Sequence, residues 1–411
     1  MARKMKDSGI EWIGEIPEGW EVVQLKRFAE VHNGREIDVE VDSTDSSAVG
    51  VYGSGGVFKY TNRAQYSGKA VLFGRKGTLG KPLYVEGQLW AVDTMYFLTY
   101  SNRLLEKFSY YQFLAFNWVP YITHTAIPSV VASEIVACYF PIPPLEEQAK
   151  IADYLDNGCA SLDTILDKTR SSIEEYKKLK QAVITQAVTK GVRGKREMKD
   201  SGVEWIGEIP KEWGRTKIKM IASFFNGDRT SRYPQPSDFV DSGVAFLTSR
   251  NIDSDEVDLS ETKYITDDKY KSLSGAKIQI DDIIFCLRGS VGKCAINRTL
   301  SCGTVASSLA TIRPKDIYPE YLLYFLLSNI ASTQTTIFMN GTCAANLSAE
   351  SVGNYYITLP ISAEQKEIAN YLDAKCAEID GLIAKKEQLV KELESYKKSL
   401  IYEVVTGKRE V

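Results

Sequence analysis

Two stretches of the chain carry a heptad pattern of apolar residues. Within residues 145–189, positions at every seventh residue from Leu155, and again from Cys159, are mostly apolar. The same pattern starts at Leu372 and Cys376 in a second stretch near the end of the chain. Apolar residues at this spacing form one stripe along a helix, and a coiled coil buries such a stripe against another helix. The pattern therefore predicts two long helices.

The two helices are the simplest partners for one another. If each helix leads away from its own domain and the domains lie at opposite ends, the two helices must pack antiparallel. The alternative is that each stripe packs only on its own domain. Asn157 and Gly158 are expected to break the first helix, and Gly381 to weaken the second, because glycine is a poor helix former.

The chain contains part of its own sequence twice. Residues 5–17 read MKDSGIEWIGEIP and residues 198–210 read MKDSGVEWIGEIP. The two helices repeat at a separation of 217 residues, whereas the first motif repeats at 193. A period near two hundred residues fits a tandem pair of domains and is far too long for a solenoid repeat.

Between these repeated ends, the pattern is that of mixed domains rich in strands. Short β-favouring runs at residues 21–25, 69–73 and 95–100 are separated by turn residues, and helices are expected at 104–117 and 319–329. The predicted fold class is α+β. It comprises two mixed α/β domains related by pseudo-twofold symmetry and separated by two long helices that form an antiparallel coiled coil. The predicted boundaries are 1–143, 144–192, 193–358 and 359–411.

Composition limits the classes of function. The formal net charge is −3, so a surface for nucleic acid must be a local patch. No apolar run is long enough to span a membrane, and the first residues lack a signal segment, which together favour a cytoplasmic protein. Seven cysteines without a CxxC pair fit a reducing compartment, with Cys159 and Cys376 as small buried residues.

Candidate catalytic chemistry is sparse. The glycine spacing in residues 74–81 does not fit a phosphate-binding loop, and Pro82 stands where serine or threonine is required. His32 and His124 have no cysteine neighbours at metal-ligand spacing and no counterparts in the second copy. No NPPY-type or DPPY-type tetrapeptide is present. The sequence predicts no catalytic residue and no metal site.

The repeated segments resemble a known family. The SGxEWIGEIPxxW segments, the P-x-x-EQ-x-x-I-A-x-Y-LD helix openings and the VTxG-like helix ends resemble the specificity subunits of Type I restriction–modification enzymes. The likeness covers the whole chain. It implies two target-recognition domains that each read half of a split double-stranded DNA site. It also implies helices that set the spacer and dock two modification subunits.

The resemblance further implies which cofactors the partners hold. S-adenosylmethionine belongs to the modification subunits, which methylate adenine, and no cofactor is expected in this chain. Restriction subunits, where two of them join the complex, use ATP and Mg²⁺. The runner-up function is a coiled-coil scaffold whose two adaptor domains bind proteins, and a further alternative is an enzyme with an unfamiliar active site.

A DNA-binding role requires positive and amide side chains in the loops of both domains. Arginine and lysine neutralise phosphates, and bidentate arginine or asparagine reads base edges. Tyrosine packs on sugars or unstacked bases. The candidates in the first copy are Arg35, Tyr52, Lys59, Tyr60, Asn62, Arg63, Arg75, Lys76 and Lys81, and those in the second are Asn226, Arg229, Thr230, Arg232, Arg250, Asn251, Arg288 and Lys293.

A glycine pair recurs among these candidates, at Gly77 and Gly80 and again at Gly289 and Gly292. It is expected to form a tight turn at a strand end, close to bound DNA or purely structural. Because the pair recurs, it cannot distinguish the two half-sites. Specificity is expected from the divergent segments 38–63 and 228–258.

The ends of the two helices are more apolar than a two-helix seam requires. We expect these ends to join helices of the modification subunits. The alternative is that they cover the WIGEIP segments of this same chain. The residues concerned are Val183, Ile184, Ala187, Val188, Leu400, Ile401, Val404 and Val405.

Overall fold

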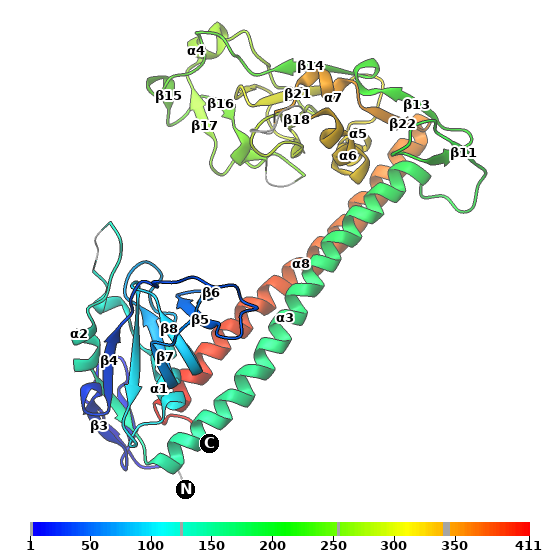
Figure 1. Ribbon diagram of the computed structural model, residues 1–411. Helices are drawn as coiled ribbons and strands as arrows, with labels where there is room; N and C mark the ends of the chain where they lie inside the picture. The colour runs from blue at the N-terminus through cyan, green and yellow to red at the C-terminus, as the bar shows by residue number, and fades with distance from the viewer. Residues whose placement is uncertain (1–2, 124–125, 253–254, 340–345) are drawn as a thin grey trace. The chain divides into compact units, whose positions relative to one another are not determined.

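The computed structural model describes residues 3–123, 126–252, 255–339 and 346–411 (Figure 1). The chain divides into two compact units, Met1–Arg170 with Glu387–Val411, and Ser171–Lys386. The division runs through both long helices rather than at their ends, so each unit holds one mixed domain and one half of each helix. His124 lies outside the described residues.

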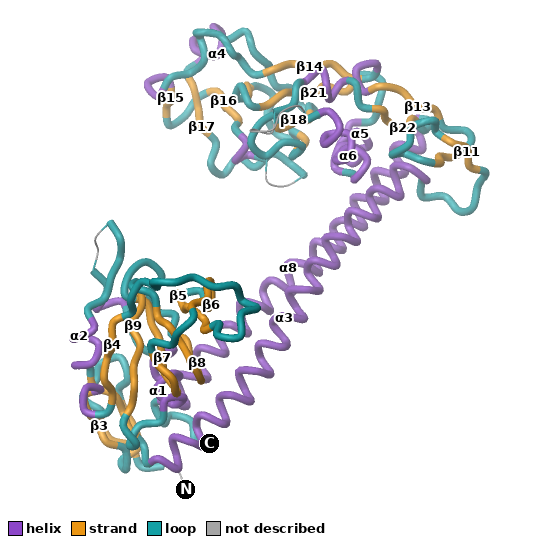
Figure 2. The backbone as a smooth tube through the Cα atoms, in the orientation of Figure 1, coloured by secondary structure: helices purple, strands orange, loops and turns teal. Residues whose placement is uncertain are grey.

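The two predicted long helices are α3 (Leu145–Lys190) and α8 (Ser362–Val405). Both run without a break in the backbone trace (Figure 2). The expected interruption at Gly158 is therefore wrong. A glycine inside a helix costs only about 1 kcal/mol relative to alanine, which the packing of the apolar stripe outweighs. None of the described helices is both long and apolar enough to cross a membrane.

In the first unit the halves of α3 and α8 pair antiparallel. The Nζ atom of Lys397 lies 2.6 Å from Oδ1 of Asp163, and Nη2 of Arg170 lies 2.6 Å from Oε1 of Glu394. Residue numbers thus rise along one helix as they fall along the other. The predicted seam positions of this half, from Leu155 onward, are buried or half-buried.

The second unit repeats this arrangement. Lys180 Nζ lies 2.7 Å from Asp380 Oδ2, and the Nζ atom of Lys386 lies 5.7 Å from the ring centroid of Tyr176. Although partial burial alone would lower it, the pKa of Lys180 is raised by the hydrogen bond to Asp380 and by nearby carboxylates. The predicted antiparallel coiled coil is confirmed within each unit, and packing of each helix on its own domain alone is wrong.

The first mixed domain is built on a six-stranded sheet in the order β4-β9-β7-β8-β5-β6. Its neighbours are antiparallel except for β5 and β8, which pair in parallel. Two-stranded ribbons, β1 with β2 and β3 with β10, complete the domain. The elements are β1 (Met5–Asp7), β2 (Glu15–Pro17), β3 (Glu21–Gln24), β4 (Ala29–Asn33), β5 (Val49–Gly53), β6 (Gly56–Thr61), β7 (Tyr66–Gly74), β8 (Leu83–Ala91), β9 (Met95–Tyr100), α1 (Glu106–Ala115), α2 (Ala132–Ala137) and β10 (Tyr139–Ile142).

The second mixed domain has two four-stranded sheets, β14-β21-β18-β19 and β15-β17-β16-β20, and the ribbons β11-β12 and β13-β22. The helix expected at 319–329 ends at Leu327, and a new helix begins at Asn329. The elements are β11 (Met198–Asp200), β12 (Glu208–Pro210), β13 (Gly214–Lys217), β14 (Ala222–Asn226), β15 (Phe239–Val240), β16 (Val244–Leu247), β17 (Lys263–Ile265), α4 (Asp267–Ser272), β18 (Ile283–Cys286), β19 (Cys294–Ile296), β20 (Gly303–Val305), β21 (Leu309–Pro314), α5 (Pro319–Leu327), α6 (Asn329–Phe338), α7 (Ala349–Gly353) and β22 (Tyr356–Leu359).

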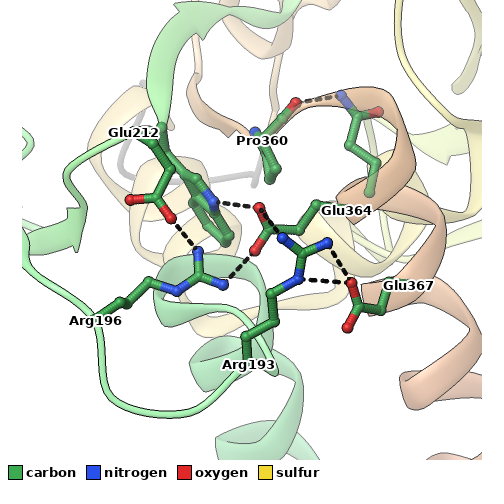
Figure 3. A network of polar contacts seen from close by, with 8 residues as sticks. Arg193, Arg196, Glu212, Pro360, Glu364 and Glu367 are labelled. Atoms are coloured by element: carbon green, nitrogen blue, oxygen red, sulfur yellow. Dashed lines mark hydrogen bonds and ion pairs between the residues drawn. The ribbon is translucent and has the colours of Figure 1, made fainter.

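The repeated glutamate at each helix opening fixes the repeated tryptophan. In the second unit Glu364, 1% exposed, accepts hydrogen bonds from Trp213 Nε1 at 3.0 Å and from Arg196 Nη2 at 2.6 Å. Figure 3 shows Arg196 held between Glu364 and Glu212. In the first unit Trp20 Nε1 donates to Glu147 Oε2 at 3.1 Å. The repeated residues thus form the same glutamate–tryptophan hydrogen bond in both units, which we call the glutamate joint.

The repeated aspartate of the helix openings anchors a tyrosine of the adjoining domain. Tyr111 donates to Asp156 Oδ1 at 2.7 Å, and Tyr324 donates to Asp373 Oδ1 at 2.7 Å. Burial, then the hydrogen bond to Asp373, raises the pKa of Tyr324 above its usual range, so the hydroxyl remains a donor. The most similar residues of the two copies therefore hold each helix to its domain.

The apolar helix ends are covered by the chain itself. In the first unit the end of α8 belongs to a core with Ile13 and Trp20, and in the second the end of α3 belongs to a core with Ile206 and Trp213. The docking prediction is corrected in favour of its alternative, because buried side chains offer no surface to a partner helix. Seven of the eight residues are buried, namely Ile184, Ala187, Val188, Leu400, Ile401, Val404 and Val405, and Val183 is half-buried against the same core.

Candidate nucleic-acid interface

In the first unit, the turn between β8 and β9 gathers several predicted DNA-binding residues at one corner. The backbone N–H of Arg35 donates to Ala91 O at 2.9 Å, and Val92 N–H donates to Tyr52 O at 3.1 Å. The N–H of Arg75 donates to Thr94 O at 2.8 Å. Strand ends far apart in sequence therefore meet at residues 92–94, and we call this the first corner.

The second unit builds the same corner around the turn between β20 and β21. Gly227 N–H donates to Leu309 O at 3.2 Å, Ala306 N–H to Leu247 O at 2.8 Å, and Leu287 N–H to Ser308 O at 2.9 Å. This second corner, at residues 306–308, brings the loop after β14 beside the loop after β18. Asn226 at the end of β14 is exposed, as are Arg229 and Arg288 on these loops.

A glycine makes each corner possible. A β-carbon at Gly34 would overlap the carbonyl oxygen of Val92, and one at Gly227 would overlap the carbonyl oxygen of Ala306. No other residue allows so close an approach of two backbones. Both glycines follow an asparagine, Asn33 and Asn226, in the printed sequence.

The predicted turn of the glycine pair is confirmed. Gly77 and Gly80 have φ values of 80° and 71°, and Gly289 and Gly292 have 74° and 90°. Left-handed backbone of this kind favours glycine. Lys76 and Lys81 are exposed at the turn of the first unit, and Arg288 and Lys293 at that of the second.

A second loop closes over each glycine turn. Lys76 forms a β-bridge with Ser129, and Arg288 forms one with Asn346. The Nε atom of Arg288 also donates to Asn346 Oδ1 at 3.1 Å. Each cation therefore has a fixed backbone, which is what a positioned phosphate contact requires.

The cluster on edge strand β6 and the two residues after it is partly neutralised. Lys59 forms an ion pair with Glu40 at 2.7 Å, and Arg63 forms one with Asp38. Exposed pairs contribute little to stability, so a phosphate can replace the carboxylate at low cost. Arg63 also lies over the ring of Trp90, 5.5 Å from its centroid, and that indole donates to Arg35 O at 2.7 Å. The remaining members, Tyr60 and Asn62, are half-buried and exposed respectively.

One candidate of the second unit is corrected. Asn251 is 1% exposed, and its Nδ2 donates to Asp258 O at 2.8 Å and to Thr262 Oγ1 at 3.1 Å. Its Oδ1 accepts from the backbone N–H of Thr248 at 2.8 Å. The amide shapes its own loop and has no group left to read a base.

Three other candidates of the second unit are exposed. Arg250 and Arg232 are exposed. Thr230 is exposed as well, but its hydroxyl donates to Asp228 Oδ1 at 2.6 Å. Although burial alone would raise it, the pKa of Asp228 is lowered below its usual range by hydrogen bonds from Thr230 and Ser274. The loop after β14 is therefore built around a buried carboxylate. Of its arginines, Arg232 is exposed, and Arg229 is exposed but donates from Nε to Ser307 O at 3.3 Å.

The turn residues themselves were missed from the sequence. Residues 91–95 read AVDTM and residues 305–309 read VASSL, at a separation of 214 residues. The shared signal is a small residue followed by two polar ones before an apolar strand, which is too weak to recognise without the neighbouring repeats. Asp93, Thr94, Ser307 and Ser308 form the surface turns of the two corners.

Two of the cysteines lie on the long helices. Cys159 and Cys376 are buried at the helix seam, as expected, and burial raises the pKa of Cys376 to about 11. In the described ranges, no three His, Cys, Asp or Glu side chains gather in a way that could hold a metal ion.

Comparisons with known proteins identify the family. A family model described as the Type I restriction modification DNA specificity domain matches residues 17–175 and 210–392. The MjaVIII specificity subunit of Methanocaldococcus jannaschii is 26% identical over 425 residues, covering 96% of this chain and 93% of that protein. The EcoBI specificity subunit of Escherichia coli is 27% identical over 252 residues, covering 59% and 52%.

A solved structure shows the same fold. A chain described under "Structural basis underlying complex assembly and conformational transition of the type I R-M system" aligns with a TM-score of 0.71 at 16% identity, covering 96% of this chain and 99% of that one. These findings favour DNA specificity over a protein-binding scaffold. With two family segments that together span most of its length, the chain belongs to the family of Type I restriction–modification DNA specificity subunits.

Proposed function

We propose that this chain reads an asymmetric, two-part DNA site, with one half contacted by each corner. The observation that carries the proposal is the same backbone corner built twice with unlike side chains. Where the first corner presents Arg35, the corresponding place in the second holds the buried Asp228. Two unlike readers in one chain require two unlike half-sites separated by unread base pairs.

The partners follow from this proposal. Two modification subunits hold S-adenosylmethionine, and each flips and methylates one adenine at N6 while this chain holds the site. Two restriction subunits with ATP and Mg²⁺ join where the system cleaves DNA. The assembly works in the cytoplasm, and this chain contributes sequence recognition rather than catalysis.

Methylome sequencing of a host that carries this chain with its modification subunit tests the proposal. The expected result is one motif with two dissimilar halves, a fixed gap and a modified adenine in each half. A palindromic or continuous motif would overturn it, as would an unmodified genome in cells where the complex is shown to assemble.

The helix pair is proposed to set the gap. One heptad added to each of α3 and α8 lengthens the pair by about 10 Å at 1.5 Å per residue, which corresponds to about three base pairs of B-DNA. Selection from DNA with random spacers should then return a gap longer by about that number. An unchanged gap in a variant that still binds DNA would reject the role of the helices as a ruler.

A further inference from the structure

The first unit has a hollow of about 970 Å³ beside the repeated SGxEW segment. Its lining includes Gly9, Glu11, Trp12, Glu134 and Tyr139. Both carboxylates are exposed, and no described residue forms an ion pair with either of them. Tyr139 is 51% exposed, which is high for an aromatic residue next to a domain core. Acidic and aromatic groups around one hollow suit a cation.

In the second unit, an arginine side chain of the chain itself occupies the equivalent position. There Arg215 Nη1 donates to Gly202 O at 3.0 Å, and its guanidinium lies 5.4 Å from the ring centroid of Tyr356. Lys217 Nζ lies 5.3 Å from the same ring. The second copy therefore fills this place with its own arginine, between a glycine carbonyl and a tyrosine face.

The two places correspond residue by residue. Gly9 and Gly202 have φ values of 68° and 67°, and each N–H donates to the aspartate two residues earlier. Gln24 pairs with Tyr139 in β3-β10, as Lys217 pairs with Tyr356 in β13-β22. The ribbon frame is therefore the same in both units.

Arg215, which occupies this position in the second unit, has no equivalent arginine in the first unit. Val22 stands opposite Pro141 in the ribbon, where Arg215 stands opposite Thr358. A β-carbon at Gly202 would meet Arg215 at 3.2 Å, whereas one at Gly9 would meet nothing within 4 Å. The first place is thus an empty counterpart of a filled guanidinium site.

The charged residues around the hollow also differ from those at the equivalent place in the second unit. At the position of Glu134 the second copy has Ser351, at the separation of 217 residues that relates the two helices. The lining of the hollow in the first unit therefore contains two carboxylates and no lysine or arginine, while the second unit has Glu204 and its own arginine at the equivalent place. A guanidinium supplied from outside would restore the balance.

We infer that this hollow binds an arginine side chain presented by a protein subunit of the complex. DNA is not its ligand, because Glu11 and Glu134 repel phosphates. The guanidinium would donate to the carbonyl oxygen of Gly9, lie over Tyr139 and pair with the two carboxylates. That the presenting subunit is the modification subunit rests on the proposed function.

The direct test uses N-acetyl-L-argininamide as the probe and the full chain as the receptor, observed by saturation-transfer NMR. The neutral isostere N-acetyl-L-citrullinamide is the matched probe. The wild-type chain should bind the arginine probe in the range of about 1 mM, as expected for a single side chain, and should bind the citrulline probe at least about tenfold more weakly.

Variants of the chain decide whether the hollow is responsible. Glu11→Gln with Glu134→Gln should weaken binding about tenfold, and Val22→Arg should abolish it because the new side chain fills the place itself. Val22→Leu and, in the second unit, Glu204→Gln are controls that should leave binding unchanged. Equal binding by wild type and Val22→Arg would overturn the inference.

The partner is tested separately with the modification subunit. Val22→Arg should reduce assembly of the complex by about tenfold, whereas Val22→Leu should not. Equal assembly of both variants would overturn the assignment of the hollow to this interface. A wild-type complex that assembles but methylates no two-part motif would count against the proposed function instead, so the two failures are distinguishable.

Discussion

The two recognition domains share the backbone of their corners but carry different side chains there. Both corners are closed by matching backbone hydrogen bonds, such as Gly34 N–H to Met95 O in the first and Gly227 N–H to Leu309 O in the second. Both also begin with an asparagine–glycine pair at the end of a strand. Around this shared frame, the first domain has one six-stranded sheet and the second has two four-stranded sheets. The order β4-β9-β7-β8 recurs as β14-β21-β18-β19, and the parallel pair β5-β8 recurs as β16-β20. Unlike readers are therefore built on one strand arrangement.

Some side chains at the two corners match, and others differ. Lys76 and Arg288 occupy matching places after β7 and β18, so both corners keep a cation next to the glycine turn. Arg35 and Asp228 also occupy matching places, but one is exposed and the other is buried. Matching cations suit phosphate contacts that any sequence provides, and unlike neighbours suit base recognition.

The largest effect is expected at the glycines of the two corners. Gly34→Ala and Gly227→Ala should each lower the free energy of unfolding by about 3 kcal/mol or more, because a β-carbon would overlap a carbonyl oxygen of the facing turn. Hydrogen exchange measured by mass spectrometry should show faster exchange only in the unit that carries the change. Gly19→Ala, where a β-carbon meets nothing within 4 Å, is the control. Unchanged exchange in both variants would show that the corner is not a rigid frame.

The next effect distinguishes the two glutamate joints. Glu364→Ala should cost about 3 kcal/mol, since it leaves Arg196 and the indole of Trp213 without a buried acceptor. Glu147→Ala should cost only about 1 kcal/mol, because the side chain of Glu147 is 25% exposed and water can replace it. Urea unfolding of both variants measures the difference. Equal losses would mean that the joints are energetically alike despite their different burial.

DNA affinity should respond equally to the matching cations. Lys76→Ala and Arg288→Ala should each weaken binding of the complex by about 1 kcal/mol, and each should reduce the slope of affinity against salt concentration by about one. The order of preference among DNA sequences should stay the same in both variants. A changed sequence preference in one of them would make that residue a base reader. Lys211→Ala, on an exposed pair with Glu197 far from the corner in sequence, is the control.

The heptad pattern and the internal repeat predicted the helices and the tandem domains because both depend on periodic, local information. The corner was not predictable in the same way. It depends on backbone groups of four segments, including residues 92–94, and backbone hydrogen bonds leave little trace in side-chain pattern. Asn251 shows the converse problem, because an asparagine that shapes its own loop looks in sequence like one that could read adenine.

The helix ends illustrate a further limit of sequence patterns. An apolar excess at Leu400 and Val404 indicates that something covers these residues, but the pattern does not say what. The cover is the repeated WIGEIP segment of the same unit, which reaches α8 from the other end of the chain. Its Trp12 and Ile13 carbonyl oxygens both accept from the hydroxyl of Tyr402. Such long-range closure follows from the tertiary fold alone.

The smallest effects are expected at the two glycines inside the helix pair. Gly381→Ala should stabilise the second unit by up to about 1 kcal/mol, because alanine is the better helix former and a β-carbon there meets nothing within 4 Å. Gly158→Ala should gain slightly more, since its β-carbon would lie 3.6 Å from Cδ2 of Leu400, an ordinary packing distance.

Thermal unfolding of both variants measures these gains, with Gly194→Ala in a loop as the control. A destabilised Gly158→Ala would mean that the first half of the helix pair packs more tightly than the second and tolerates no added methyl group. The halves would then differ in rigidity as well as in sequence, and a spacer set by the pair would be stiffer at one end than at the other.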